Sequence, residues 1–281
     1  MKAACQSVQR LVLTILPTLA TAAIATPSVQ AATFSLSETQ IDFFDFSSPE
    51  ATDLTVTTNT NAVTVATQGQ VAAQANAEAV FLDSPPIAGN FANSTVSGSG
   101  TDYWGTAQSD ASVTGRFAVK NSFSFSFQAL LNLYSSVDDA TAESTRASGE
   151  VLFQLFDSTN PQKLTLLDTF SLSGALDSTS PHDFLKTASS PYLTLFPTSN
   201  ITQSFGGNQE FATATIEGVY QRTFTAPLFI TLVESKRSQT DASAPVNAGA
   251  VPEPFTILGT MISIGYGVVL KRRRAIRSSD Q

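Results

Sequence analysis

The stretch Phe117–Leu133, FAVKNSFSFSFQALLNL, decides the fold class, because its apolar residues fall on every second position. The odd positions are apolar throughout except for Asn121, and the even positions are mostly polar. A period of two places one face of a strand in a core and the other in water, whereas a helix would scatter these residues around its circumference. We therefore expect Phe123, Phe125 and Phe127 to be buried on one face of a central antiparallel strand.

Shorter runs of the same character recur along the chain, between turn-rich segments such as DSTNPQ and SFGGNQ. They span Thr33–Phe46, Leu54–Ala66, Glu150–Phe156, Leu164–Leu172, Tyr192–Phe196, Glu210–Phe224 and Pro227–Glu234. Many short strands separated by Gly, Asn, Asp and Pro are typical of an antiparallel β-sandwich of two sheets, and we expect a mainly β, jelly-roll-like sandwich. A closed barrel is the alternative that the same pattern allows.

The segment Gln68–Leu82 fits two structures. Its small and apolar residues alternate without a break from Val71 to Phe81, as in a strand, but its many alanines favour a helix. We favour a strand, because the neighbouring segments are strands.

The N-terminus has the features of an export signal. Lys2 and Arg10 precede an apolar run at residues 11–25, and small residues follow up to Ala32. We expect a signal peptide at residues 1–31 and a β-sandwich domain at 32–234. An uncleaved anchor is the alternative, although the apolar run is shorter than the ~20 residues that span a bilayer.

The only cysteine, Cys5, lies within this N-terminal segment. The expected mature chain therefore has no disulfide, thiolate metal site or cysteine nucleophile, and its stability must come from a hydrophobic core. Residues 32–250 carry eight basic and 21 acidic side chains, which give a net charge of −13. Such a surface disfavours binding to nucleic acid and to anionic lipid.

The C-terminal part changes character twice. Residues 235–250, SKRSQTDASAPVNAGA, have the small and polar composition of a linker. Residues 255–270 then form a run without a charge, about 24 Å long as a helix and so short for the ~30 Å hydrocarbon layer. The basic cluster that follows predicts a transmembrane helix with its C-terminus in the cytoplasm and the body outside.

Three sequence elements near the C-terminus resemble, in their order, a known sorting signal. Pro252-Glu253-Pro254, an apolar helix and Lys271-Arg272-Arg273-Arg274 follow one another as in the PEP-CTERM sorting signal of exported bacterial proteins, here at residues 251–277. The sequence VPEPFTILGT is similar to cyanobacterial versions of this signal. The resemblance implies processing by an exosortase-type membrane protease. It also implies transient attachment through the helix 255–270, and then a place in the cell envelope or the extracellular matrix with its exopolysaccharide.

The body resembles exported proteins that carry this signal, through SFSFSFQALLNL, ASGEVLFQLFD and FGGNQEF. That likeness supplies no mechanism, because such proteins share a destination and differ in their bodies.

Signatures of enzymatic chemistry are absent from the sequence, which has no GxSxG, HExxH or phosphate-binding loop. The single histidine, His182, lies in TSPHDF, where the flanking Pro and Asp predict an exposed loop. We therefore expect a non-enzymatic protein without catalytic residues. A secreted glycan-active enzyme that uses two carboxylates is the alternative.

Three carboxylates in SVDDATAE form a candidate calcium site. Asp138, Asp139 and Glu143 lie in an expected loop, and loop carboxylates on sandwiches can hold Ca²⁺. A solvated acidic turn is the other interpretation, because the spacing fits no defined calcium loop.

The only tryptophan marks a candidate ligand site. Asp102, Tyr103 and Trp104 lie in the Gly/Ser-rich run SGSGTDYWGTAQSD, where an exposed aromatic beside polar groups could stack on a sugar ring. A carbohydrate-binding module of the exopolysaccharide matrix is therefore a second class of function. Partial burial of these aromatics at a sheet edge is the alternative.

Overall fold

The computed structural model describes residues 33–245, and the regular structure in this range is all β-strand. The expected signal peptide and sorting signal lie outside the described residues. The strands are β1 (Thr33–Phe44), β2 (Thr52–Ala66), β3 (Gln70–Asp83), β4 (Pro86–Ser99), β5 (Tyr103–Val119), β6 (Ser122–Val137), β7 (Ser144–Asp157), β8 (Thr165–Asp177), β9 (Phe184–Ser189), β10 (Leu193–Leu195), β11 (Asn200–Ser204), β12 (Gln209–Thr223) and β13 (Leu228–Ala244). Within residues 33–245, no helix has the length and apolar character needed to cross a bilayer.

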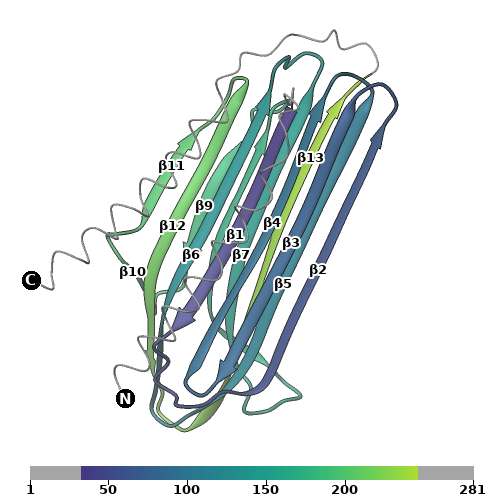
Figure 1. Cartoon of the computed structure of the whole chain (residues 1–281). Coiled ribbons are helices and arrows are strands. Elements are labelled where there is room, and N and C mark those ends of the chain that lie inside the picture. Colours follow the sequence, from purple (N-terminus) through teal and green to yellow (C-terminus); the bar gives the residue numbers. More distant parts are fainter. Residues whose placement is uncertain (1–32, 246–281) are drawn as a thin grey trace, which may run out of the picture. The chain divides into compact units, whose positions relative to one another are not determined.

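The strands form two antiparallel sheets that face each other (Figure 1). Sheet A has the order β10-β12-β6-β1-β4-β3, and β11 also pairs with β12. Sheet B has the order β2-β5-β13-β7-β8-β9. The expectation of a mainly β chain with two antiparallel sheets is confirmed.

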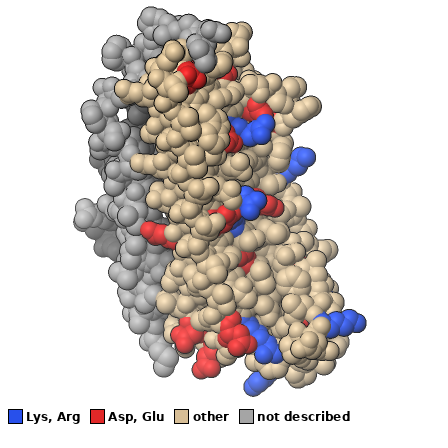
Figure 2. All heavy atoms as spheres, turned by 90° about the vertical axis from the view of Figure 1, so that its right-hand side faces the viewer, with Lys and Arg blue, Asp and Glu red and all other residues tan. Residues whose placement is uncertain are grey.

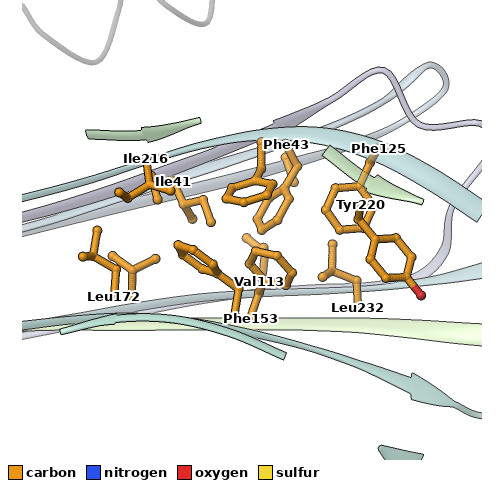
Figure 3. Packing of buried hydrophobic residues seen from close by; sticks show 14 of the residues in the cluster. Ile41, Phe43, Val113, Phe125, Phe153, Leu172, Ile216, Tyr220 and Leu232 are labelled. Carbon is orange, nitrogen blue, oxygen red and sulfur yellow. The ribbon is translucent and has the colours of Figure 1, made fainter. Parts of the chain in front are cut away.

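Aromatic side chains fill one half of the space between the sheets. Phe123, Phe125 and Phe127 of β6 are buried on one face, as predicted. Phe153 of sheet B packs edge-on against Phe125 and Phe127, with ring centroids 5.7 and 5.1 Å apart. Figure 3 shows side chains from the two sheets, such as Phe43 and Phe153, meeting in this core. Interdigitated rings of this kind supply the dispersion and burial that hold the sheets together.

The other half of the interior is lined by small and hydroxyl side chains. Ser37 Oγ donates to the main-chain oxygen of Ser148 at 2.7 Å, and Ser238 Oγ donates to that of Ser37 at 2.7 Å. Each bond joins one sheet directly to the other, which short side chains permit because the backbones approach closely. A Cβ on Gly149 would lie 2.4 Å from Leu131 Cδ1, so this position accepts only glycine without a shift.

The stretch that decided the fold class contains the end of one strand and most of the next, and these two strands lie in different sheets. β5 ends at Val119 and β6 begins at Ser122, with Lys120 and Asn121 in the turn between them. The expectation of one strand over 117–133 is therefore wrong. Phe117 enters the core from sheet B and Phe123 from sheet A, because a two-residue turn preserves the alternation while the chain passes to the opposite sheet.

The segment Gln68–Leu82 is a strand, as we expected. It forms β3 at one edge of sheet A, and its alanines from Ala73 to Ala79 are the half-buried residues of the strand. Their small size suits the closely spaced half of the sandwich, which explains an alanine content more typical of a helix.

The expected linker at 235–250 is wrong over residues 235–244. These residues belong to β13, which lies between β5 and β7 in sheet B. The inward positions from Glu234 to Ala244 are all buried, and they include Lys236, Ser238 and Thr240. Polar composition suggested a linker, but the hydroxyl-lined half of the interior accepts Ser238 and Lys236 because both hydrogen-bond to the facing sheet.

Candidate functional site

The candidate ligand residues 102–104 do not form one site. Tyr103 and Trp104 are consecutive in β5 and therefore point to opposite faces of sheet B. Tyr103 is buried, and its hydroxyl shares a 2.8 Å hydrogen bond with Thr33 Oγ1. Trp104 is 43% exposed, and Asp102 lies in the preceding bend with a φ of 57°. Of the two aromatics, only Trp104 is placed to contact a ligand.

Trp104 lies on the outer face of sheet B, which is rich in hydroxyl and amide side chains. Four cross-strand rows run over it, namely Val65, Trp104 and Ser243; Val63, Thr106, Asp241 and Arg146; Asn61, Gln108, Gln239 and Ser148; and Asn59, Asp110, Arg237 and Glu150. This face offers donors and acceptors in a regular array, as a polyhydroxyl ligand requires.

An open depression of ≈ 440 Å³ lies on this outer face and is lined from β2, β5, β13 and β7. Arg237 Nε donates to Asp110 Oδ1 at 2.8 Å beside Glu150. The hydrogen bond and the charge of Asp110 raise the pKa of Arg237, so this cation is fully charged at neutral pH. The depression therefore combines a guanidinium, carboxylates and hydroxyls, which suits hydrogen bonding to a polar ligand.

The acidic residues of the candidate calcium site hold the turn between β6 and β7. Glu143 Oε2 accepts the main-chain N–H groups of Asp138 and Asp139 at 2.9 and 3.1 Å. Asp139 Oδ1 accepts the N–H and the hydroxyl of Thr141 at 2.9 and 2.6 Å. In the part of the chain that the structure describes, no group of three or more His, Cys, Asp or Glu is arranged to hold a metal ion. Calcium binding by these residues stays a prediction.

His182 lies in an exposed loop between β8 and β9, as we expected. Its main-chain N–H donates to Ser180 Oγ at 3.3 Å, which is a local turn contact.

Sequence reasoning missed a cluster of charged and amide groups between the two sheets. Glu234 and Lys236 point inward from β13, Asn90 points inward from β4, and all three are at most 3% exposed. Lys236 Nζ lies 3.5 Å from Glu234 Oε1 and donates to the main-chain oxygen of Asn90 at 2.7 Å. The Asn90 amide Nδ2 donates to Glu234 Oε2. The side-chain oxygen Asn90 Oδ1 and the carboxylate oxygen Glu234 Oε1 have no hydrogen-bond partner.

Apolar residues and one further carboxyl group surround this cluster. Asp42 of β1 is 6% exposed, and its charge acts on Lys236. Ile41 and Ala79 flank Asn90 in sheet A, and Val113 and Phe153 flank Glu234 in sheet B. Burial raises the pKa of Glu234 against the attraction of the Lys236 charge. Burial also lowers the pKa of Lys236 to about 8. The neutral forms of both groups are therefore much more accessible than they would be in water.

A second inter-sheet polar link lies at the aromatic end. Tyr220 Oη donates to Asp168 Oδ2 at 2.9 Å, and Arg222 Nη1 contacts the same oxygen at 2.7 Å. Asp168 is 3% exposed and lies on β8, so this set joins β12 of sheet A to sheet B. Its groups are mutually satisfied, which indicates a structural role.

A signal for the buried cluster was present in the sequence. The alternation that starts at Ile230 and Leu232 continues through Glu234 and Lys236 to Ala244. Following the period through polar residues would have assigned both charged side chains to the core face.

No family model matches the chain, and neither a curated protein nor a solved structure matches it.

Proposed function

We propose that this chain is an exported, non-enzymatic protein of the cell envelope or the extracellular matrix. A C-terminal signal would hold it at the membrane until an exosortase-type protease processes it. The observation that carries the proposal is the order of Pro252-Glu253-Pro254, the uncharged run 255–270 and the basic cluster Lys271–Arg274. An N-terminal apolar segment with preceding cations supports the same route.

Cell fractionation tests this proposal. Mature protein should be recovered outside the cytoplasm, with a first residue near Ala32 by mass spectrometry of its N-terminal peptide. A chain that starts at Met1 in the cytoplasmic fraction would refute export.

The edges of the sandwich support a matrix role through contact with a second copy of this chain. β2 is 15 residues long, pairs with β5 alone among the described strands, and has no charged residue from Leu54 to Ala66. The opposite edges are formed by β9, β10 and β11, of 6, 3 and 5 residues. Figure 2, which views the side where β2 lies in Figure 1, shows uncharged areas between separate groups of Lys, Arg, Asp and Glu.

Charge favours the β2 edge as the contact. A body with a net charge of −13 repels its own copies over most of its surface. Two β2 edges can meet without bringing like charges together, because residues 54–66 carry no charge. A long and uncharged edge offers a row of main-chain donors and acceptors to another strand. We therefore propose antiparallel pairing of β2 with β2 of a second copy.

Sedimentation velocity of the full chain over a range of concentrations tests the pairing. A concentration-dependent dimer should form, and Thr58→Lys with Thr60→Lys should weaken it, because two-fold pairing near Asn59 brings like charges together. Thr165→Lys on β8 is the matched control and should leave the dimer unchanged. A monomer at every concentration, or a dimer that the β2 variant does not affect, would refute the contact.

Glycan binding by the outer face of sheet B is the second candidate function. Trp104 is exposed beside the rows of hydroxyl and amide side chains. A sugar ring can stack on the indole while the sugar hydroxyls form hydrogen bonds with these side chains. Binding to an acidic or neutral exopolysaccharide without turnover should be lost in Trp104→Ala and retained in Phe205→Ala. Equal binding by both variants would contradict this candidate, and release of shorter glycans would indicate a glycan-active enzyme instead.

A further inference from the structure

The buried cluster of Asn90, Glu234 and Lys236 brings together an amine, a carboxamide and a carboxyl group away from water. These are the groups that amide exchange requires: a nucleophile, an electrophilic carbonyl carbon and an acid–base group. They come from both sheets, because Asn90 lies on β4 of sheet A and the other two lie on β13 of sheet B. A bond between them would tie the sheets together covalently.

We propose that Lys236 and Asn90 form an intramolecular amide cross-link, with Glu234 as the group that transfers the proton. This modification is independent of the proposed route of export and of the proposed contact between copies. It would stabilise a chain whose expected mature part has no cysteine for a disulfide.

The positions of the three groups carry the proposal. Lys236 Nζ lies 2.7 Å from the main-chain oxygen of Asn90. The main-chain oxygen and Cγ of one asparagine are separated by three bonded atoms and so lie within about 5 Å of each other. Rotation within the flexible lysine side chain can therefore bring Nζ towards Cγ while both strands keep their places. The rigid sheets hold the reactants in register, which replaces a bimolecular encounter by an intramolecular one.

Glu234 contacts both reactants. Its Oε1 lies 3.5 Å from Lys236 Nζ, and its Oε2 accepts from the Asn90 side chain. The Asn90 Oδ1 is buried without a partner, and a half-turn of the amide directs this oxygen at Glu234. A protonated Glu234 then donates to Oδ1 and polarises the carbonyl.

The step balances in atoms and electrons. Proton transfer from the ammonium of Lys236 to Glu234 gives a neutral amine and a neutral carboxylic acid. The Nζ lone pair attacks Asn90 Cγ, the Nζ–Cγ bond forms and the Cγ–Nδ2 bond breaks. A proton of the amine passes through Glu234 to Nδ2, which leaves as ammonia, and no oxidant or reductant is needed.

The apolar surroundings favour this protonation pattern. Burial raises the pKa of Glu234 and lowers that of Lys236 to about 8, so both neutral forms are favoured relative to water. Val113, Val151, Ala111 and Phe153, which pair with the two β13 residues, exclude the water that would compete for Cγ.

Peptide mass spectrometry of the purified full chain tests the cross-link after denaturation and proteolysis. A single species should contain the peptides of Asn90 and Lys236, lighter by about 17 Da than their sum because ammonia is lost. Recovery of both peptides in linear form at their full masses would overturn the proposal. A loss of about 18 Da on a carboxylate would overturn Asn90 as the partner, because water is then the leaving group.

Two variants define the roles of the residues. Glu234→Gln keeps the lysine and the asparagine but removes the titrating acid, and it should give linear peptides. Lys186→Arg replaces an exposed lysine on β9, and it should keep the cross-link. A cross-link that persists in Glu234→Gln would overturn the role of Glu234. If that variant does not fold, the peptide masses of the wild-type protein still show whether the cross-link exists.

Discussion

The aromatic half of the core should be the main source of stability, and Phe125 tests this most sharply. Phe125 is 1% exposed and lies at the centre of the rings from both sheets. Its ring centroid is 5.2–5.8 Å from those of five other residues: Phe43, Phe46, Phe123, Phe153 and Tyr220. Phe125→Ala removes these contacts and opens a cavity that two stacked sheets cannot close.

The expected cost follows from two parts. Loss of ring burial costs about 2–3 kcal/mol, and the residual cavity brings the total to about 3–5 kcal/mol. In a chain of this size, that cost lowers the melting temperature by about 10 °C. Chemical and thermal unfolding of the full chain measure both quantities.

Phe205→Ala is the matched control. This phenylalanine is 38% exposed in the loop before β12, and its truncation should cost less than about 1 kcal/mol. Equal stability losses in Phe125→Ala and Phe205→Ala would refute the central position of the aromatic cluster.

Three further outcomes follow from the structure. Gly98→Ala should lower the free energy of unfolding by about 1–3 kcal/mol, because its Cβ would lie 2.1 Å from the Tyr103 ring, and wild-type stability would contradict this close packing. Burial raises the pKa of Glu210 from 4.5 to about 7, so its contribution to stability is present below pH 4.5 and is lost as the pH rises through 7. Denaturant titrations of Glu210→Gln from pH 4 to 8 should show a smaller fall in the free energy of unfolding as the pH rises. A pH profile equal to that of the wild type would contradict the role of Glu210. If Asp138, Asp139 and Glu143 bind Ca²⁺, a concentration 100 times the dissociation constant should raise the free energy of unfolding by ~2.7 kcal/mol, and an unchanged melting temperature in millimolar Ca²⁺ would refute the site.

Alternation along the sequence was enough to predict the sheets and much of the core. Phe123 and its neighbours in β6, and the alanines of β3, lie on the faces that the period of two assigns to them. The turn at Lys120–Asn121 was missed because both flanking runs face the same core from opposite sheets, so the period continues through the turn.

The candidate ligand site was harder to predict. Gly and Ser around Trp104 suggested a loop, but in the closely spaced half of the sandwich such small residues form strands. Once β5 is known to be a strand, the opposite orientations of Tyr103 and Trp104 follow from its pleat.

The buried cluster could be placed on the core face by the alternation in β13, but its contacts could not. Asn90 and Lys236 are 146 positions apart in sequence, and they meet only because β4 and β13 lie in facing sheets. Sequence periodicity carries no information on which strands of two sheets face each other.

The C-terminal peptide of the mature protein from native cells tests the proposed function most directly. Mass spectrometry should find a chain that ends near Pro252 in the envelope or matrix fraction, and replacement of Pro252-Glu253-Pro254 by alanines should retain the protein in the membrane. From the sequence, we expect the Pro-Glu-Pro element to keep the preceding chain extended, as a protease cleft requires, and Pro254 to suit the start of the proposed helix. An intact chain through Arg277 in the membrane fraction would contradict processing and indicate a permanent anchor.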